Sequence, residues 1–242
     1  NVKPLITHRF DITDAPKAYE LITGKSGEPF LGVVLTYPET SSITASRKLD
    51  LSPAAKPVSS ITVGVLGAGN YAQAVFLPTI KKIGGVQLTG IASASGLSAS
   101  HAARKFGFAF TSSDENEVLN NPEINTVVVL TRHNQHASQV ITALQNGKNV
   151  YCEKPLAINE EELQSVEEVL KSRPKGILTV GFNRRYAPFA IKLKEFIAKS
   201  ESPMSIDYRV NAGYLPANHW TQDPAIGGGR VIGEACHFID FC

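Results

Sequence analysis

The chain has 242 residues, with 24 basic and 22 acidic side chains and a formal net charge of +2. Its hydrophobic content of 43% is typical of a globular protein with one large or two modest cores. The near-balanced charge excludes a protein that binds nucleic acid by electrostatic attraction, and no apolar run is long enough to span a bilayer. Three cysteines, Cys152, Cys236 and Cys242, lack the spacing of a zinc site or a disulfide framework. These features predict a cytoplasmic protein without a metal site.

Residues 1–37 predict a strand, a helix and a second strand. LITHRF at 5–10 and LGVVLTY at 31–37 have the composition of strands, and Pro16 suits the first turn of a helix between them. Such a unit is too small to own a core. Residues 38–60 are rich in Ser, Pro and Ala and lack periodicity, which predicts a linker at a domain boundary.

From residue 61 the predicted strands and helices alternate. Strands are expected at 61–66, 86–92, 126–130, 150–152 and 177–182, and helices at about 70–83, 97–106, 134–146, 159–172 and 186–198. Runs such as TVVVL are apolar on both faces, as in parallel strands buried between two helix layers. The pattern predicts a Rossmann-type doubly wound parallel α/β sheet over residues 61–182. The alternating segment SIDYRVN at 205–211 predicts that residues 183–242 begin an α+β substrate domain with an antiparallel sheet.

A glycine-rich turn follows the first strand of this sheet. It comprises Gly67, Ala68, Gly69, Asn70, Tyr71 and Ala72, a G-x-G-x-x-A pattern. Gly67 permits the tight turn, Gly69 lets the backbone approach a pyrophosphate, and Ala72 allows close helix–strand packing. The free N–H groups and the positive end of the helix would face the phosphates. A plain tight turn would use the same glycines, but a position between a strand and a helix favours a dinucleotide site.

The second strand lacks the acid that would bind the ribose 2′-hydroxyl of NAD. Ser93 stands where an Asp is expected, and a serine would not repel a 2′-phosphate. The sequence therefore favours NADP, or little discrimination between NADP and NAD. His101 and Arg104 on the following helix could help to hold an anion, or could be solvated helix charges.

Residues 147–155, GKNVYCEKP, end in the triplet Glu153-Lys154-Pro155. Together with GAGNYA at 67–72, this triplet resembles the glucose–fructose oxidoreductase, inositol dehydrogenase and rhizopine-catabolism (Gfo/Idh/MocA) family. TRHNQH at 131–136, GFNRRY at 181–186 and GGGRVIGEACHFID at 227–240 extend the resemblance over roughly residues 60–242. It implies an NAD(P)-dependent oxidoreductase that moves hydride to or from a hydroxyl-bearing carbon of a sugar, cyclitol or nucleotide-sugar.

The resemblance also assigns roles to site residues. Lys154 would lie beside the nicotinamide and donate to a substrate hydroxyl or take its proton, with Glu153 orienting it or touching the cofactor. Pro155 would fix the backbone, and the family often has a cis bond there. Thr131 and His136 would lie at the sheet edge where cofactors bind, although a packing or capping role fits His136 equally.

In the family, the helix after the glycine-rich segment carries an Asp and, four residues later, a His. His237 is present, whereas Gly233 takes the place of the Asp, and Glu234 lies about 100° round the helix from that face. His237 would serve as a general acid or base, or have only a structural role. Further candidates for the substrate site are Asn183, Arg184, Tyr186 and Trp220.

A second resemblance concerns residues 1–37, which look like the C-terminal tail of a medium-chain, zinc-alcohol-dehydrogenase-like reductase. With the linker at 38–60, it predicts that the chain is a fragment of a bi-domain oxidoreductase. Expected partners are a small sugar-type substrate and further copies of the protein, joined through the sheet domain. Two other functions stay open: a non-catalytic sensor that binds a sugar or dinucleotide, and a reductase of a non-sugar substrate.

Overall fold

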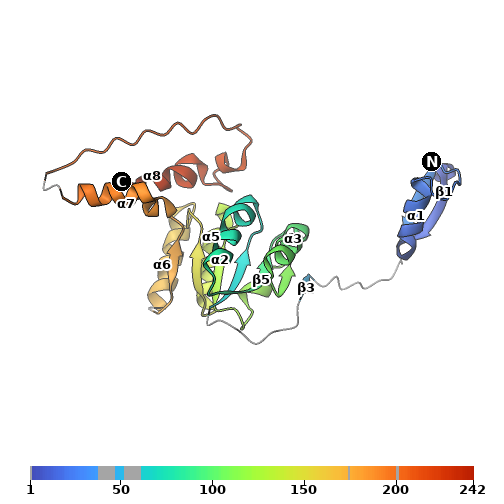
Figure 1. Cartoon of the computed structure of the whole chain (residues 1–242), viewed down its shortest axis with the longest axis horizontal. Helices are drawn as coiled ribbons and strands as arrows, with labels where there is room; N and C mark the ends of the chain where they lie inside the picture. Colours follow the sequence, from blue (N-terminus) through green and yellow to red (C-terminus); the bar gives the residue numbers. More distant parts are fainter. Residues whose placement is uncertain (1, 38–46, 52–60, 174, 200–201) are drawn as a thin grey trace. The chain divides into compact units, whose positions relative to one another are not determined.

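The computed structural model describes residues 2–37, 47–51, 61–173, 175–199 and 202–242. They belong to two units, residues 1–45 and residues 46–242, each of which is compact by itself (Figure 1). Among the described residues, no helix combines the length and the apolar character needed to cross a membrane.

The first unit consists of a parallel pair of strands joined by a helix. Strand β1 (Ile6–Asp11) pairs with β2 (Gly32–Thr36), and α1 (Ala15–Ile22) connects them. The helix has a proline in its first turn and buries Ala18 and Leu21. The predicted strand–helix–strand order is confirmed.

The second unit is built on one sheet, which has seven strands in the described residues. Their spatial order is β3-β6-β5-β4-β7-β8-β9. The strands are β3 (Lys48–Asp50), β4 (Thr62–Leu66), β5 (Gln87–Ala92), β6 (Phe110–Ser112), β7 (Thr126–Val129), β8 (Asn149–Cys152) and β9 (Leu178–Val180). All pairings are parallel except that of β3 with β6. From β6 to β9 this is the strand order of a doubly wound Rossmann fold, as predicted.

Helices cover both faces of the sheet (Figure 1). Helices α2 (Leu77–Ile83) and α3 (Gly96–Phe106) pack on one face, and α4 (Asn116–Leu119), α5 (His133–Gln145) and α6 (Glu160–Ser172) on the other. Along β7, Val127 and Val129 enter the core under α5, and Val128 enters the core under α2 and α3. This alternation explains why the strand is apolar at every position.

Three elements of this unit were not predicted. Strand β6 and helix α4 are each too short to show a hydrophobic period. Strand β3 lies inside the segment predicted as a linker, so that prediction is wrong for Lys48–Asp50, which pair antiparallel with β6. The remaining residues of that segment, apart from Arg47 and Leu51, lie outside the described residues.

Residues 183–242 continue with α7 (Pro188–Ile197), a π-helical turn (Val231–Ala235) and α8 (Cys236–Phe241). The predicted strand at 205–211 is wrong, because in the described residues this extended segment has no neighbouring strand with which to form a ladder. It lies along α8 instead, and the Tyr208 ring stacks on Phe238 with centroids 5.2 Å apart. The antiparallel sheet expected for this part of the chain is therefore not formed by the described residues.

Gly64 on β4 is closely packed, so a side chain at this position should destabilise the fold. A methyl group at this position would come within 2.5 Å of the Val118 side chain and 2.9 Å of the Ile124 side chain. Replacing Gly64 with Ala should lower the free energy of unfolding by about 1–3 kcal/mol, the usual cost of overpacking a core. Chemical denaturation measures it, with Gly69→Ala as the control, since a methyl group there meets no described atom within 4 Å. Equal stability of the two variants would contradict this packing.

Candidate active site

The glycine-rich turn lies where the strand order of the sheet reverses, between the carboxyl ends of β4 and β7. Ligands of doubly wound folds bind in this crevice. Gly67 has a φ of +98°, and a Cβ on it would be 2.5 Å from the Leu130 carbonyl oxygen. Its N–H donates to the Ala92 carbonyl at 2.8 Å. Only glycine fits this position, because both its conformation and its neighbour exclude a side chain.

Gly69 is different, because the space beside it is open. A methyl group there would meet no described atom within 4 Å, and Gly69, Asn70 and Tyr71 are exposed. Ala72 is buried at 1% exposure and begins the π-helical turn (Ala72–Phe76) that leads into α2. The room beside Gly69 fits the close approach of a pyrophosphate, so the loop passes the geometric test for a dinucleotide.

Ser93 follows β5 and is half-buried. Its N–H donates to the Ser112 carbonyl at 3.1 Å, which extends the pairing of β5 with β6 by one residue. His101 and Arg104 are exposed on α3, and Arg104 lies eight residues, or about 12 Å, beyond the first residue of that helix. Neither side chain is therefore at the end of the helix that faces the crevice.

Two tyrosines converge on Glu153, which follows β8. The Tyr151 hydroxyl donates to Glu153 Oε1 at 3.1 Å, and the Tyr71 hydroxyl also hydrogen-bonds to this carboxylate. Burial and the Glu153 charge raise the pKa of Tyr71 to about 12, which keeps it a neutral donor. Asn183 hydrogen-bonds to Tyr71 as well. Glu153 is thus tied to the glycine-rich loop through Tyr71.

Lys154 reaches the C-terminal part of the chain. Its Nζ donates to the Gly233 carbonyl oxygen at 2.7 Å, across 79 residues of sequence. The peptide bond between Lys154 and Pro155 is cis, as the resemblance implied. This hydrogen bond places the ammonium group beside the helix that carries His237.

Gly233 stands where the family resemblance would place an Asp, and its surroundings are closely packed. A Cβ at this position would be 3.0 Å from the Gly227 carbonyl oxygen and 3.1 Å from His133 Cε1. His133 itself is held by Gly227, whose carbonyl oxygen lies 2.8 Å from Nδ1. A side chain at this position would require these neighbours to shift, and Lys154 hydrogen-bonds to the main-chain carbonyl of Gly233.

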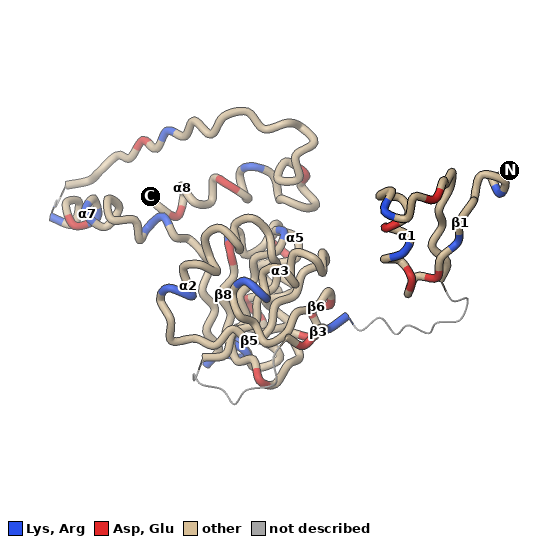
Figure 2. Tube along the Cα trace, turned by 45° about the vertical axis from the view of Figure 1, so that its right-hand side comes forward, with Lys and Arg blue, Asp and Glu red and all other residues tan. Residues whose placement is uncertain are grey.

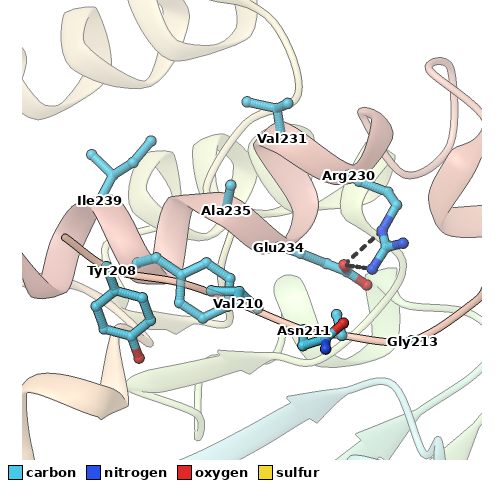
Figure 3. A pocket seen from close by; sticks show the side chains of 11 residues that line it. Tyr208, Val210, Asn211, Gly213, Arg230, Val231, Glu234, Ala235 and Ile239 are labelled. Atoms are coloured by element: carbon cyan, nitrogen blue, oxygen red, sulfur yellow. Dashed lines mark hydrogen bonds and ion pairs between the residues drawn. The ribbon is translucent and has the colours of Figure 1, made fainter.

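Glu234 does not substitute for the missing acid. Its carboxylate accepts from Arg230 Nε at 2.9 Å and lies in a groove between the π-helical turn and residues 208–213 (Figure 3). It is therefore already committed to an ion pair. The sequence predicted that Glu234 points about 100° away from the face of Gly233, and its ion pair with Arg230 is consistent with that direction.

His237 lies four residues after Gly233. Burial, reinforced by the positive charges of Lys154 and Arg184, lowers its pKa to about 4. Its Nδ1 is buried and has no hydrogen-bond partner in the described part of the chain. The Phe182 ring packs edge-on against the imidazole, with centroids 6.1 Å apart. A neutral imidazole accepts a hydrogen bond at one nitrogen and donates at the other.

His136 and Thr131 have internal partners. His136 is 1% exposed, with Nδ1 2.7 Å from the Pro155 carbonyl oxygen and Nε2 3.1 Å from that of Thr131. The Thr131 hydroxyl donates to Gln139 Oε1 at 2.6 Å. His136 therefore has no nitrogen to offer a cofactor, and it connects the end of β7 to the loop that carries Lys154. Of its two expected roles, the structure has the packing role.

The other candidates are spread around the site. Arg184 lies over the Phe238 ring at 4.5 Å from its centroid, and Tyr186 is 72% exposed. Trp220 packs edge-on against His133, with ring centroids 4.8 Å apart. Trp220 is thus packed against another side chain. Asn183 is connected to the site by its hydrogen bond to Tyr71.

Comparison with known proteins decides the family. The model of the oxidoreductase family with an NAD-binding Rossmann fold, Gfo/Idh/MocA, matches residues 61–182, which is half of the chain. The chain belongs to this family. The sequence resemblance over this part is thereby confirmed.

Individual members of the family show the same likeness. The levoglucosan dehydrogenase of Pseudarthrobacter phenanthrenivorans is 32% identical over 161 residues, which is 62% of this chain and 40% of that protein. An inositol 2-dehydrogenase/D-chiro-inositol 3-dehydrogenase of Lactiplantibacillus plantarum is 29% identical over 184 residues, or 74% of this chain and 50% of that protein. A solved levoglucosan dehydrogenase complex with NADH has a TM-score of 0.62 at 27% identity, covering 75% of this chain and 52% of that one. The chain spans about half the length of such relatives.

Within this family site, sequence reasoning missed two residues that hold Glu153. Tyr151 donates to its carboxylate, and Gly181 leaves room for both, since a Cβ there would be 2.8 Å from Glu153 Oε1 and from the Tyr151 hydroxyl. The signal for Tyr151 was its place two residues before Glu153, at the end of a strand that leads into the triplet. Gly181 begins the GFNRRY motif, but the packing that requires a glycine there comes from a neighbouring strand and is not visible in the sequence.

The buried histidines predict how stability depends on pH. The pKa values of His133 and His237 are both lowered to about 4, chiefly by burial, from an ordinary value near 6.5. The unfolded chain therefore binds more protons between these values, so the free energy of unfolding should fall as the pH drops from about 6.5 towards 4. Denaturant titrations at pH 7 and pH 5 measure the loss. It should be smaller in the double variant His133→Gln, His237→Gln, and an equal loss would contradict the low pKa values.

Proposed function

We propose that the protein is an NAD(P)-dependent oxidoreductase that moves hydride to or from a hydroxyl-bearing carbon of a sugar, cyclitol or nucleotide-sugar. The observation that carries this proposal is the Lys154–Gly233 hydrogen bond, which joins an ammonium group to the helical segment that carries His237. Relatives named as levoglucosan and inositol dehydrogenases support the substrate class.

The cofactor would supply the hydride chemistry, and the chain would bind and orient it. The loop around Gly69 would hold the pyrophosphate, with main-chain N–H groups facing its charge. Glu153, fixed by Tyr71 and Tyr151, would hold the loop after β8 in register with the glycine-rich loop. This arrangement would bring Lys154 near the nicotinamide end of the crevice.

Lys154 and His237 would handle the proton of the reacting hydroxyl. Lys154 has ammonium N–H groups beyond the one that it gives to Gly233, and one of these would donate to the substrate oxygen. His237, kept neutral by burial and by the neighbouring positive charges, would accept from the same hydroxyl. Hydrogen bonds of both kinds on one oxygen align it for proton transfer in step with hydride transfer.

Two other functions were open from the sequence, a non-catalytic sensor and a reductase of a non-sugar substrate. The paired Lys154 and His237 favour an enzyme over a sensor, because a binding protein needs no proton-transfer groups. The named sugar and cyclitol relatives favour the substrate class over a non-sugar compound. Turnover in a screen of sugars, cyclitols and nucleotide-sugars would separate the three.

We also propose that residues 1–37 are the tail of a medium-chain reductase, which makes the protein a bi-domain oxidoreductase. Their parallel β1–α1–β2 arrangement and their separation as a unit support this. We further propose that the protein is cytoplasmic, forms homo-oligomers and does not bind nucleic acid. The net charge of +2 supports the last of these.

Dinucleotide binding should depend on Gly69. The substitution Gly69→Val places a branched side chain in the open space beside the loop and should weaken binding more than about tenfold, or about 1.4 kcal/mol. Calorimetric titration with NADH and NADPH measures this. Unchanged affinity for both dinucleotides would show that the pyrophosphate lies elsewhere.

Turnover should depend on Lys154. Loss of one positioned proton-transfer group typically lowers a rate by about 10²–10⁴-fold, so Lys154→Met should reduce kcat by that factor and leave dinucleotide affinity close to that of the parent protein. The assay uses the sugar or cyclitol that the unmodified protein oxidises fastest. Lys171→Met is a suitable control, because that side chain is exposed on α6. Normal kcat in Lys154→Met would rule out the assigned role.

A further inference from the structure

Three polar residues, Ser93, Ser113 and Arg47, form one row at the edge of the sheet. Ala92, Ser112 and Lys48 are partners in register across β5, β6 and β3. The next position on each strand is Ser93, Ser113 and Arg47. The Ser113 N–H donates to the Arg47 carbonyl at 2.9 Å, so the pairing continues to this row.

This row faces the first turn of α3. Ile91, two residues before Ser93, packs in the core under α3, and side chains two residues apart share a face of a strand. Gly96, at the start of α3, lies next to Ser113, since a Cβ on it would be 3.8 Å from the Ser113 Cβ. Ser95 caps that helix without a side-chain hydrogen bond, so the first N–H groups of the helix also border this region.

The Arg47 side chain is available to a ligand. It is 72% exposed, and its contact with Asp114 is long, with 3.4 Å between Nη1 and Oδ2. Asp114 is the nearest acid, but it is occupied at the start of α4, where Oδ1 accepts from the Asn116 N–H and side-chain amide at 3.0 Å each. In Figure 2 basic positions of β3 lie beside acidic positions near β6. Neither the Ser93 nor the Ser113 hydroxyl has a partner among the described residues.

We propose that Arg47, Ser93 and Ser113 form a subsite for a phosphate monoester on the adenosine ribose of the dinucleotide, that is, for the 2′-phosphate of NADP. The inference rests on the proposed dinucleotide site and adds a residue outside the part that matches the family. Neighbouring strands are about 4.8 Å apart, so Ser93 and Arg47 lie roughly 10 Å from each other, and a phosphate above Ser113 is within reach of both. The planar guanidinium suits bidentate contact with phosphate oxygens.

The row has no carboxylate at the end of β5, where an acid would select the free 2′-hydroxyl of NAD. Arg47 also offsets the charge of Asp114, which would otherwise repel a phosphate. Discrimination between NADP and NAD would therefore depend on Arg47, which β3 positions by pairing antiparallel with β6. The expected readout is the ratio of two dissociation constants, for NADPH and NADH, which differ only in the phosphate.

The test compares Arg47→Gln with Arg104→Gln in the whole chain, by fluorescence or calorimetric titration with NADPH and NADH. Arg104 is the matched control, being an exposed arginine on α3 without a place in the row. Loss of a hydrogen bond to a charged group predicts about ten- to a hundredfold weaker NADPH binding in Arg47→Gln, with NADH affinity unchanged. Arg104→Gln should change neither, and Arg47→Lys should restore part of the loss. Ser93→Asp should weaken NADPH binding and not NADH binding.

Three results would overturn the inference. They are an unchanged NADPH-to-NADH ratio in Arg47→Gln, an equal loss for both cofactors, and an unmodified protein that binds NADH much more tightly than NADPH. In each of these the proposed dinucleotide site itself stands, because a dinucleotide still binds. Binding of neither cofactor to the unmodified protein would overturn the proposed function together with the inference. Circular dichroism of every variant separates lost binding from lost folding.

Discussion

The hydrogen bond from Lys154 to the Gly233 carbonyl is the contact on which the candidate site depends. It joins the loop after β8 to a helix 79 residues further along the chain. The helix packs closely at Gly233, where a Cβ would lie 3.0 Å from the Gly227 carbonyl oxygen and 3.1 Å from His133 Cε1. The same close packing brings His237, one helical turn later, next to the ammonium charge, which helps to hold its imidazole neutral.

A second set of contacts connects the glycine-rich loop to this site. Tyr71 belongs to the loop, Glu153 precedes Lys154, and the hydrogen bond between them spans the crevice at the reversal of strand order. His136 adds a buried link from the end of β7 to the Pro155 carbonyl. Since a hydrogen bond made by a buried group is costly to break, the His136 link favours one arrangement of the loop that carries Lys154.

The edge of the sheet shows how a short added strand can alter a site. Three residues of β3 pair with β6, and the residue before them, Arg47, is thereby placed near the end of β5. The family model matches residues 61–182, so this strand lies outside the matched part. A charge at this edge would act at short range on a phosphate bound beside it.

The sequence by itself determined the parallel sheet, the glycine-rich turn and the family. These follow from local patterns, because buried parallel strands are apolar throughout, a strand–helix turn of this shape requires Gly67, and the Glu153-Lys154-Pro155 triplet is a short contiguous motif. Strand β3 could not be predicted, since three residues carry no period and its partner lies over 60 residues away. The sequence showed that Gly233 takes the place of the acid. It did not show the close packing at Gly233, because His133 and Gly227 come from distant segments. Only the tertiary structure decided that His136 is buried and that residues 205–211 lie on α8, because burial and strand pairing depend on neighbours far apart in the chain.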